Sequence, residues 1–139
     1  MKNPKAEIRK LVYEMLSGIE TPVYNAVLKS NKPPYVFIGQ QTFVETSLKD
    51  TNMGIHTILI DVVTTFTENF GGDKQANDIS DEIGEILSTM ADYSTDNFHV
   101  ITANIDTDDM LYDTNGSERI VSQVTTIRNL IQQKTILQS

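Results

Sequence analysis

The chain has 139 residues, a length that fits one domain covering residues 1–139 and able to bury roughly two thirds of its unfolded surface. It contains no cysteine, which excludes disulfide frameworks, thiol nucleophiles and cysteine-bound zinc. Its 19 acidic residues outnumber 11 basic ones, and the formal charge of -8 opposes binding to nucleic-acid phosphates. Because charges interrupt every apolar stretch near the N-terminus, we expect a soluble protein made in the cytoplasm, with no membrane association.

An amphipathic helix is predicted near the N-terminus, from Ala6 to Ile19. Its apolar residues recur every three or four positions and share one side of a helix; they are Ile8, Leu11, Val12, Met15, Leu16 and Ile19. Gly18 and Pro22 mark the end of the helix. Residues 23–28 favour a short strand, and the sequence KSNKPP after them predicts a loop.

Two strands are predicted in the middle of the chain. In KPPYVFIGQQ the paired prolines disfavour a helix, so Tyr35 to Ile38 is expected to form a strand that ends or bends at Gly39. This stretch contains no group for chemistry, and we interpret it as scaffold. The segment GIHTILIDVVTTF (54–66) alternates and predicts a long central strand, with one apolar face made of Ile58, Ile60, Val62 and Phe66.

The most regular helical pattern follows the glycine pair in TENFGGDK. Asp73 is expected as the N-cap, where its negative charge complements the helix dipole. One apolar stripe should pack this helix on a sheet; its members are Ala76, Ile79, Ile83, Ile86, Leu87 and Met90. A glycine pair before a helix also occurs in phosphate-binding loops, but the GK[ST] ending is missing here, so we favour a helix cap.

The last third of the chain predicts a pair of strands. Both NFHVITANI (97–105) and ERIVSQVTTIRNLI (118–131) alternate, and the segment between them is expected to form a long β-arm or flap with a turn at Asn115-Gly116. The predicted fold class is α+β. We expect an antiparallel or mixed β-sheet of about four to five strands with two main helices packed on one face, plus a long β-hairpin or flap.

The two histidines are the first candidates for catalysis. His56 and His99 lie in predicted strands far apart in the sequence, and neither has a cysteine, a serine elbow or a second histidine near it. We therefore interpret them as core or surface histidines. The sequence predicts no enzyme activity, no catalytic residue and no cofactor.

An acidic cluster near the end of the chain could supply oxygen ligands to calcium. It consists of Asp106, Asp108, Asp109 and Asp113. The segment departs from the EF-hand loop, because it lacks glycine at the sixth position and glutamate at the twelfth. A solvated acidic loop without metal is the preferred interpretation, and calcium binding is the alternative.

Several apolar residues stand where a monomer would leave them in contact with water. Apolar anchors surrounded by polar residues are typical of protein contacts. We predict a protein interface that includes Met110, Leu111, Tyr112, Phe70, Ile136 and Leu137. Packing of each loop onto its own domain is the alternative.

The order of these elements resembles a known family. The segments PPYVFIG and GIHTILIDVVTTFTENFGGDKQANDISDEIGEIL, followed by a terminal β-pair, resemble the tail terminator (tail completion) proteins of long-tailed bacteriophages. The likeness extends from about Ala6 to Ile131. The family motifs correspond here to Pro34, Tyr35 and Val36, to Ile58 through Phe66, to Gly71 and Gly72, and to Ala76, Ile79 and Ile83. The segments 106–116 and TPVYNAV depart from the family pattern.

The resemblance implies a structural role in the virion. Family members are expected to form a homo-oligomeric ring, a hexamer, that caps the tail tube protein, stops tube polymerisation and presents a surface to the head-tail connector (stopper) protein. Each subunit of a closed ring needs two different complementary flanks. The candidates are the sheet edges, the flap 106–116 and the loop from Glu45 to Met53. Genomic DNA would pass through an acidic lumen without specific binding, because like charges repel.

Two alternatives remain at this point. One is another head-tail connector component, a stopper or an adaptor, which would bind portal-side proteins and leave tube extension unaffected. The other is a small metal-dependent or hydrolytic enzyme that uses His56 or His99 with nearby aspartates.

Overall fold

The computed structural model describes residues 1–26, 32–66, 72–115 and 118–134. The elements within these ranges are α1 (Lys5–Leu16), β1 (Val23–Tyr24), β2 (Tyr35–Glu45), β3 (Met53–Phe66), α2 (Gly72–Ser88), β4 (Phe98–Asn115) and β5 (Glu118–Gln133). Their strands form one mixed sheet in the order β1-β2-β3-β5-β4, where β1 runs parallel to β2 and the other neighbours are antiparallel. This architecture confirms the predicted α+β class.

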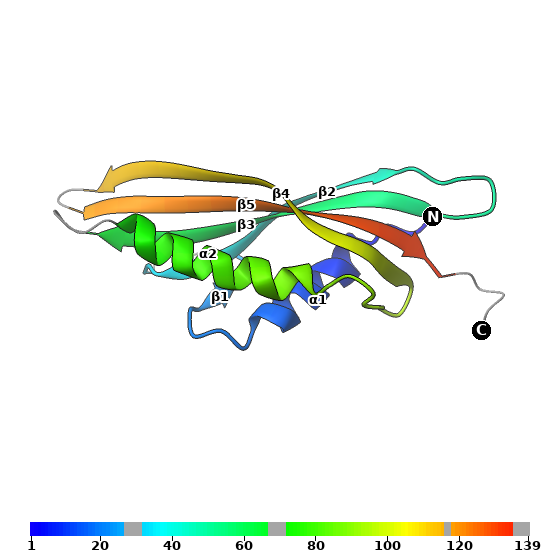
Figure 1. The fold of residues 1–139 in the computed structure, drawn as a ribbon, viewed down its shortest axis with the longest axis horizontal. Coiled ribbons are helices and arrows are strands. Elements are labelled where there is room, and N and C mark those ends of the chain that lie inside the picture. The colour runs from blue at the N-terminus through cyan, green and yellow to red at the C-terminus, as the bar shows by residue number, and fades with distance from the viewer. Residues whose placement is uncertain (27–31, 67–71, 116–117, 135–139) are drawn as a thin grey trace.

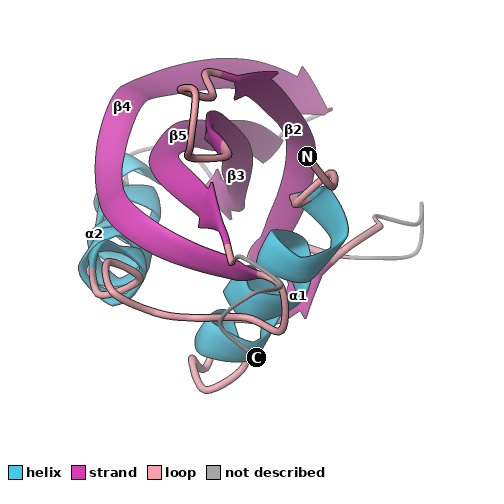
Figure 2. Cartoon of the chain, turned by 90° about the vertical axis from the view of Figure 1, so that its right-hand side faces the viewer, coloured by secondary structure: helices cyan, strands magenta, loops and turns pink. Residues whose placement is uncertain are grey.

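Both helices lie on the same side of the sheet (Figure 1). The connection between β2 and β3 lies at one end of the long axis, and the end of β4 and the beginning of β5 lie at the other. Viewed along this axis, β4 sweeps through a wide arc around β5 and β3, as expected for strongly twisted long strands (Figure 2). The opposite face of the sheet, here called the outer face, carries no helix from the described residues.

The helix α1 packs on the sheet through three residues spaced four apart. Ile8, Val12 and Leu16 are fully buried, as the sequence predicted. The predicted end at Ile19 is wrong by three residues. The helix ends earlier because both the backbone N–H (3.4 Å) and the hydroxyl (2.7 Å) of Ser17 donate hydrogen bonds to the carbonyl of Glu14.

The helix α2 buries the predicted stripe. Ala76, Ile83 and Leu87 are inaccessible to solvent or nearly so, and Met90 just beyond the helix is fully buried. The helix begins at Gly72, so Asp73 lies in its first turn and not at the N-cap as predicted.

The strand β3 is the centre of the sheet, because β2 and β5 pair with it on either side. Its buried face contains Ile58, Ile60 and Val62, as predicted. The side chain of Phe66, the fourth residue of the predicted face, lies outside the described part of the structure. The apolar core between this face and the helices is therefore the one that the alternation indicated.

The strand β2 is longer than predicted. Its pairing with β3 shifts between Ile38 and Gln41, which is the bend expected at Gly39, and then continues to Glu45. The prediction that the strand could end at Gly39 is wrong, since the long neighbour β3 supplies hydrogen-bonding partners for the polar sequence QQTFVE. At the other side of β2, β1 covers only Val23–Tyr24. The predicted short strand over 23–28 is wrong at Asn25 and Ala26, which lie in a bend, and its last two residues lie outside the described ranges.

The expected long β-hairpin is confirmed, but its arm is a regular strand. The segment from Asp106 to Asn115, predicted as a flap or acidic loop, belongs to β4 and pairs with β5 as far as Asn115 opposite Glu118. Aspartate disfavours strands, yet β5 offers a continuous row of partners that overrides this preference. Register shifts near Ile101 and Asp106 mark irregularities where β4 bends.

Candidate protein-interaction site

The β2 edge of the sheet is closed over much of its length. The strand β1 pairs with Val36 and Phe37, and the Arg9 guanidinium from α1 donates to the backbone carbonyls of Ile38 and Gly39, the latter at 2.7 Å. Arg9 also donates to Gln41 Oε1 at 3.3 Å. Burial lowers the pKa of Arg9, in keeping with its position between helix and strand. Strand addition at this part of the β2 edge is therefore blocked.

The β4 edge is closed only at its beginning. The segment before β4 folds back on it, with Asp92 N–H donating to the Val100 carbonyl (2.7 Å) and Val100 N–H donating to the Tyr93 carbonyl (2.8 Å). Beyond Val100, β4 is the edge strand of the sheet, and no other described segment pairs with the edge of β4 that points away from β5. Such an open edge can accept contacts from another chain.

The predicted interface residues Met110, Leu111 and Tyr112 lie on this open edge. Leu111 is 59% exposed and Tyr112 is 60% exposed, whereas Met110 is partly buried. Leu111 stands opposite Ser122 on the outer face, and Tyr112 stands opposite Val121 on the helix face. The Tyr112 hydroxyl donates to Met110 Sδ at 3.0 Å. We call residues 106–113 the β4 tip.

The other three predicted interface residues are Phe70, Ile136 and Leu137. They lie outside the described residues, so their interface role stays a prediction. The candidate loop between β2 and β3 adds one further exposed apolar side chain, Leu48, which is 70% exposed. That loop lies at the opposite end of the molecule from the β4 tip (Figure 1).

The aspartates of the β4 tip do not converge on one point. Asp108 accepts hydrogen bonds from Gln123 (3.1 Å) and Thr125 (3.3 Å) on the helix face. Asp109 pairs in register with Val124 and points to the outer face. No three acidic or histidine side chains in the described ranges come together as a metal site. The geometry therefore gives the calcium hypothesis no ligand set within those ranges.

A hollow that the sequence did not reveal lies on the outer face. Its volume is about 200 Å³, and its lining comes from β3, β4 and β5: Ile55, Thr102, Asn104, Arg128, Asn129 and Leu130. We call it the outer-face hollow. Ile55 stands directly opposite Leu130, and Arg128 stands opposite Asn104. In the sequence, the only sign of this hollow is Arg128 in the alternating segment ERIVSQVTTIRNLI. The sequence does not show which strands lie beside Arg128.

His56 is part of the core. It is fully buried, and its ring nitrogens contact Gln41 Nε2 at 2.8 Å and Asn129 Nδ2 at 3.3 Å. Burial, with a smaller effect of the Lys5 charge, lowers its pKa to about 4. This confirms the interpretation of His56 as a satisfied core histidine.

His99 lies at the surface beside a serine and an aspartate. Ser94 Oγ is 3.0 Å from His99 Nδ1, and Asp92 Oδ1 is 3.9 Å from His99 Nε2. The second distance is too long for a hydrogen bond, and Asp92 is 91% exposed, so it does not orient the ring. The arrangement resembles a triad in residue types but lacks the geometry that activates a serine.

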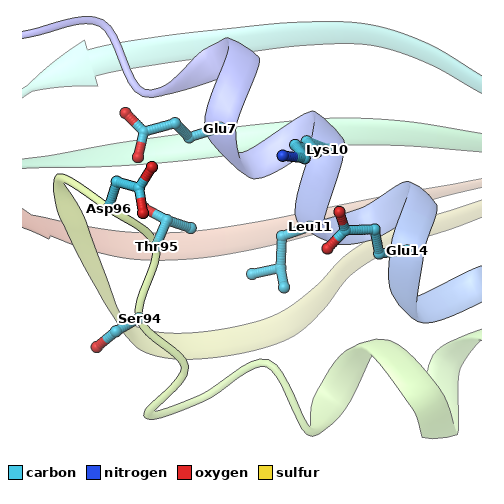
Figure 3. Close-up of a pocket in the computed structure, with 7 residues that line it drawn as sticks. All are labelled: Glu7, Lys10, Leu11, Glu14, Ser94, Thr95 and Asp96. Carbon is cyan, nitrogen blue, oxygen red and sulfur yellow. The ribbon is translucent and has the colours of Figure 1, made fainter.

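A second pocket, of about 210 Å³, separates α1 from the turn before β4 (Figure 3). Glu7 points toward this turn and accepts hydrogen bonds from Asn97, from its N–H at 3.0 Å and from Nδ2 at 2.8 Å. Burial raises the pKa of Glu7, but the Asn97 hydrogen bonds outweigh it and hold the pKa below its ordinary value. Glu7 thus ties α1 to the start of β4.

None of the helices in the described part of the chain is both long and apolar enough to cross a membrane.

Comparison with known proteins gives a fold relationship. No protein-family model and no curated protein matches the chain. A solved structure described as the virion of a native gene transfer agent (GTA) particle contains a similar chain, with a TM-score of 0.65 and 20% sequence identity. The similarity covers 87% of this chain and 91% of the other. At this identity, the two chains share a fold over nearly their whole lengths.

Proposed function

We propose that this chain is a structural virion protein, a tail terminator that assembles into a ring on the tail tube, stops tube polymerisation and joins the tail to the head. The observation that carries the proposal is the open β4 edge with its exposed apolar tip, which a solitary subunit leaves in contact with water. The fold shared with a chain of a virion, together with the resemblance to tail terminators, supports the same role.

The two edges of the sheet suit a ring of identical subunits. A ring uses head-to-tail contacts, in which each subunit offers two different surfaces. Here β1 and Arg9 close much of one edge, whereas β4 leaves the other open. This asymmetry favours contacts between unlike surfaces over the pairing of two like edges.

The acidic character of the chain fits passage of DNA without binding. With a net charge of -8, a ring of such subunits would repel phosphates at its lumen. Location of the acidic side chains on the outer rim of the assembled ring would contradict this part of the proposal.

The test is assembly. Sedimentation of the purified protein at several concentrations should reveal a ring, and negative-stain images with tail tube protein should show that ring at the tube end. Tube extension should stop when the protein is added. A species that stays monomeric and ignores the tube would overturn the proposal, and binding to portal-side proteins without any effect on the tube would assign the chain to the stopper or adaptor class.

A further inference from the structure

The outer-face hollow combines an apolar wall with a free cation. Ile55 of β3 and Leu130 of β5 are side-by-side partners on adjacent strands, and both are only partly buried. Arg128, two residues before Leu130, is exposed and forms no hydrogen bond or ion pair with any described residue. A guanidinium beside apolar side chains is a composition typical of binding hot spots.

The β4 tip has the complementary pattern. Asp109 and Leu111 are both exposed and, two residues apart on one strand, both point to the outer face. Asp109 has no hydrogen bond or ion pair with the described residues. The tip therefore offers an anion and an apolar side chain about 7 Å apart, which is also the spacing between Arg128 and Leu130.

The tip cannot reach the hollow of its own chain. Leu111 stands opposite Ser122, whereas the hollow contains Leu130, eight residues (130 - 122) further along β5. At the rise of a strand this separation is about 27 Å. Pairing of two tips is also unfavourable, because four aspartates, Asp106, Asp108, Asp109 and Asp113, would meet their own copies.

We propose that the β4 tip of one copy docks into the outer-face hollow of the next copy, with Asp109 on Arg128 and Leu111 against Ile55 and Leu130. This contact rests on the proposed ring and names the two flanks that build it. It is head-to-tail, since each subunit contributes a tip to one neighbour and a hollow to the other.

A charge exchange tests the pairing. Arg128→Glu and Asp109→Lys should each weaken self-association by about tenfold or more in sedimentation equilibrium, and the double variant should recover most of that loss. Lys10→Glu and Glu82→Lys carry the same charge changes on exposed helix positions and should assemble like the wild type. Thermal unfolding of each variant, followed by circular dichroism, verifies that the fold is intact.

Cross-linking tests the direction of the contact. The chain has no cysteine, so Leu111→Cys and Asn104→Cys introduce single thiols at the tip and at the rim of the hollow. A short bis-maleimide should join the two variants when they are mixed, and should join neither with a Tyr13→Cys control. The variant that carries both thiols should give a ladder of species beyond the dimer.

The outcomes separate this inference from the proposed function. Rings that persist in Arg128→Glu and Asp109→Lys, or a mixture that gives no tip-to-hollow product, would overturn the contact and leave the terminator role standing. A doubly substituted chain that stops at the dimer would overturn head-to-tail docking. A wild-type protein that is monomeric at every concentration, with or without tube, would overturn both.

Discussion

His56 lies against Asn129 in the core, with the Asn129 Nδ2 atom 3.3 Å from His56 Nδ1 and the Asn129 Oδ1 atom buried without a hydrogen bond. On the other side of the ring, Gln41 Nε2 lies 2.8 Å from His56 Nε2, and its orientation is fixed because it also donates to the Lys5 carbonyl at 2.8 Å. Rotation of the Asn129 side-chain amide by 180° would place Oδ1 beside the imidazole ring, where it accepts a hydrogen bond from His56 Nδ1–H. This assignment gives both ring nitrogens of a neutral imidazole a hydrogen-bond partner.

Acid should destabilise the protein through His56. Its folded-state pKa of about 4 lies below the ordinary value of 6.5, so the unfolded chain binds a proton first as the pH falls. The contribution is fully present above pH 6.5 and is lost between that value and about 4, a loss of roughly 3 kcal/mol in the free energy of unfolding. Urea unfolding at a series of pH values measures it.

A control variant isolates the histidine. His56→Gln keeps a polar side chain at this position but removes the titration, so its stability should change less between pH 7 and 5 than that of the wild type. Equal pH dependence in His56→Gln and the wild type would contradict the role of His56.

Arg9 is expected to contribute to stability through the β2 carbonyls that it binds. Arg9→Met keeps much of the apolar stem but leaves the carbonyls of Ile38 and Gly39 without their donor. The free energy of unfolding should fall by about 1–3 kcal/mol. Lys10→Met, one residue further along α1 and partner-free among the described hydrogen bonds, should change it by less than about 0.5 kcal/mol in the same denaturant titration.

The fold could be predicted where alternation or helical periodicity was strong. The stripe of α2 and the apolar face of β3 were correct because burial of one face demands that spacing. The segment 106–116 lies between two alternating stretches and is rich in aspartates, which favours a flap, and no local signal shows that β5 supplies strand partners as far as Asn115. The length of β2 was missed for the same reason, since pairing with β3 decides it.

Only the part of the candidate site that is contiguous in the sequence could be predicted. Met110, Leu111 and Tyr112 stood out as consecutive apolar residues among aspartates, and the structure places them on the open edge. The hollow depends on cross-strand neighbours, because Ile55 and Leu130 come from distant segments that meet only when β3 pairs with β5. Register of this kind cannot be read from either strand alone.

Gly54 should tolerate no side chain. A Cβ atom at this position would lie 2.3 Å from two ring atoms of Phe43 and 2.8 Å from the Val44 carbonyl oxygen. Gly54→Ala must therefore displace both the ring and the backbone of β2, and we expect a loss of about 1–3 kcal/mol. Gly18→Ala is the matched control, since nothing lies within 4 Å of its Cβ position. Equal melting temperatures for the two variants would contradict this close approach.

Asp108 and Asp109 are neighbours with separate tasks, and alanine at each should separate stability from assembly. Asp108→Ala removes the acceptor for Gln123 and Thr125, which are only 5% and 2% exposed, so the free energy of unfolding should fall by about 1–2 kcal/mol. Asp109→Ala removes an exposed carboxylate and should change the free energy of unfolding by less than about 0.5 kcal/mol.

Self-association should show the reverse order of effects. Asp109→Ala should associate more weakly than Asp108→Ala at concentrations where both variants are folded. Because the two residues face opposite sides of one strand, an equal effect of both on either measurement would contradict the register of β4 with β5.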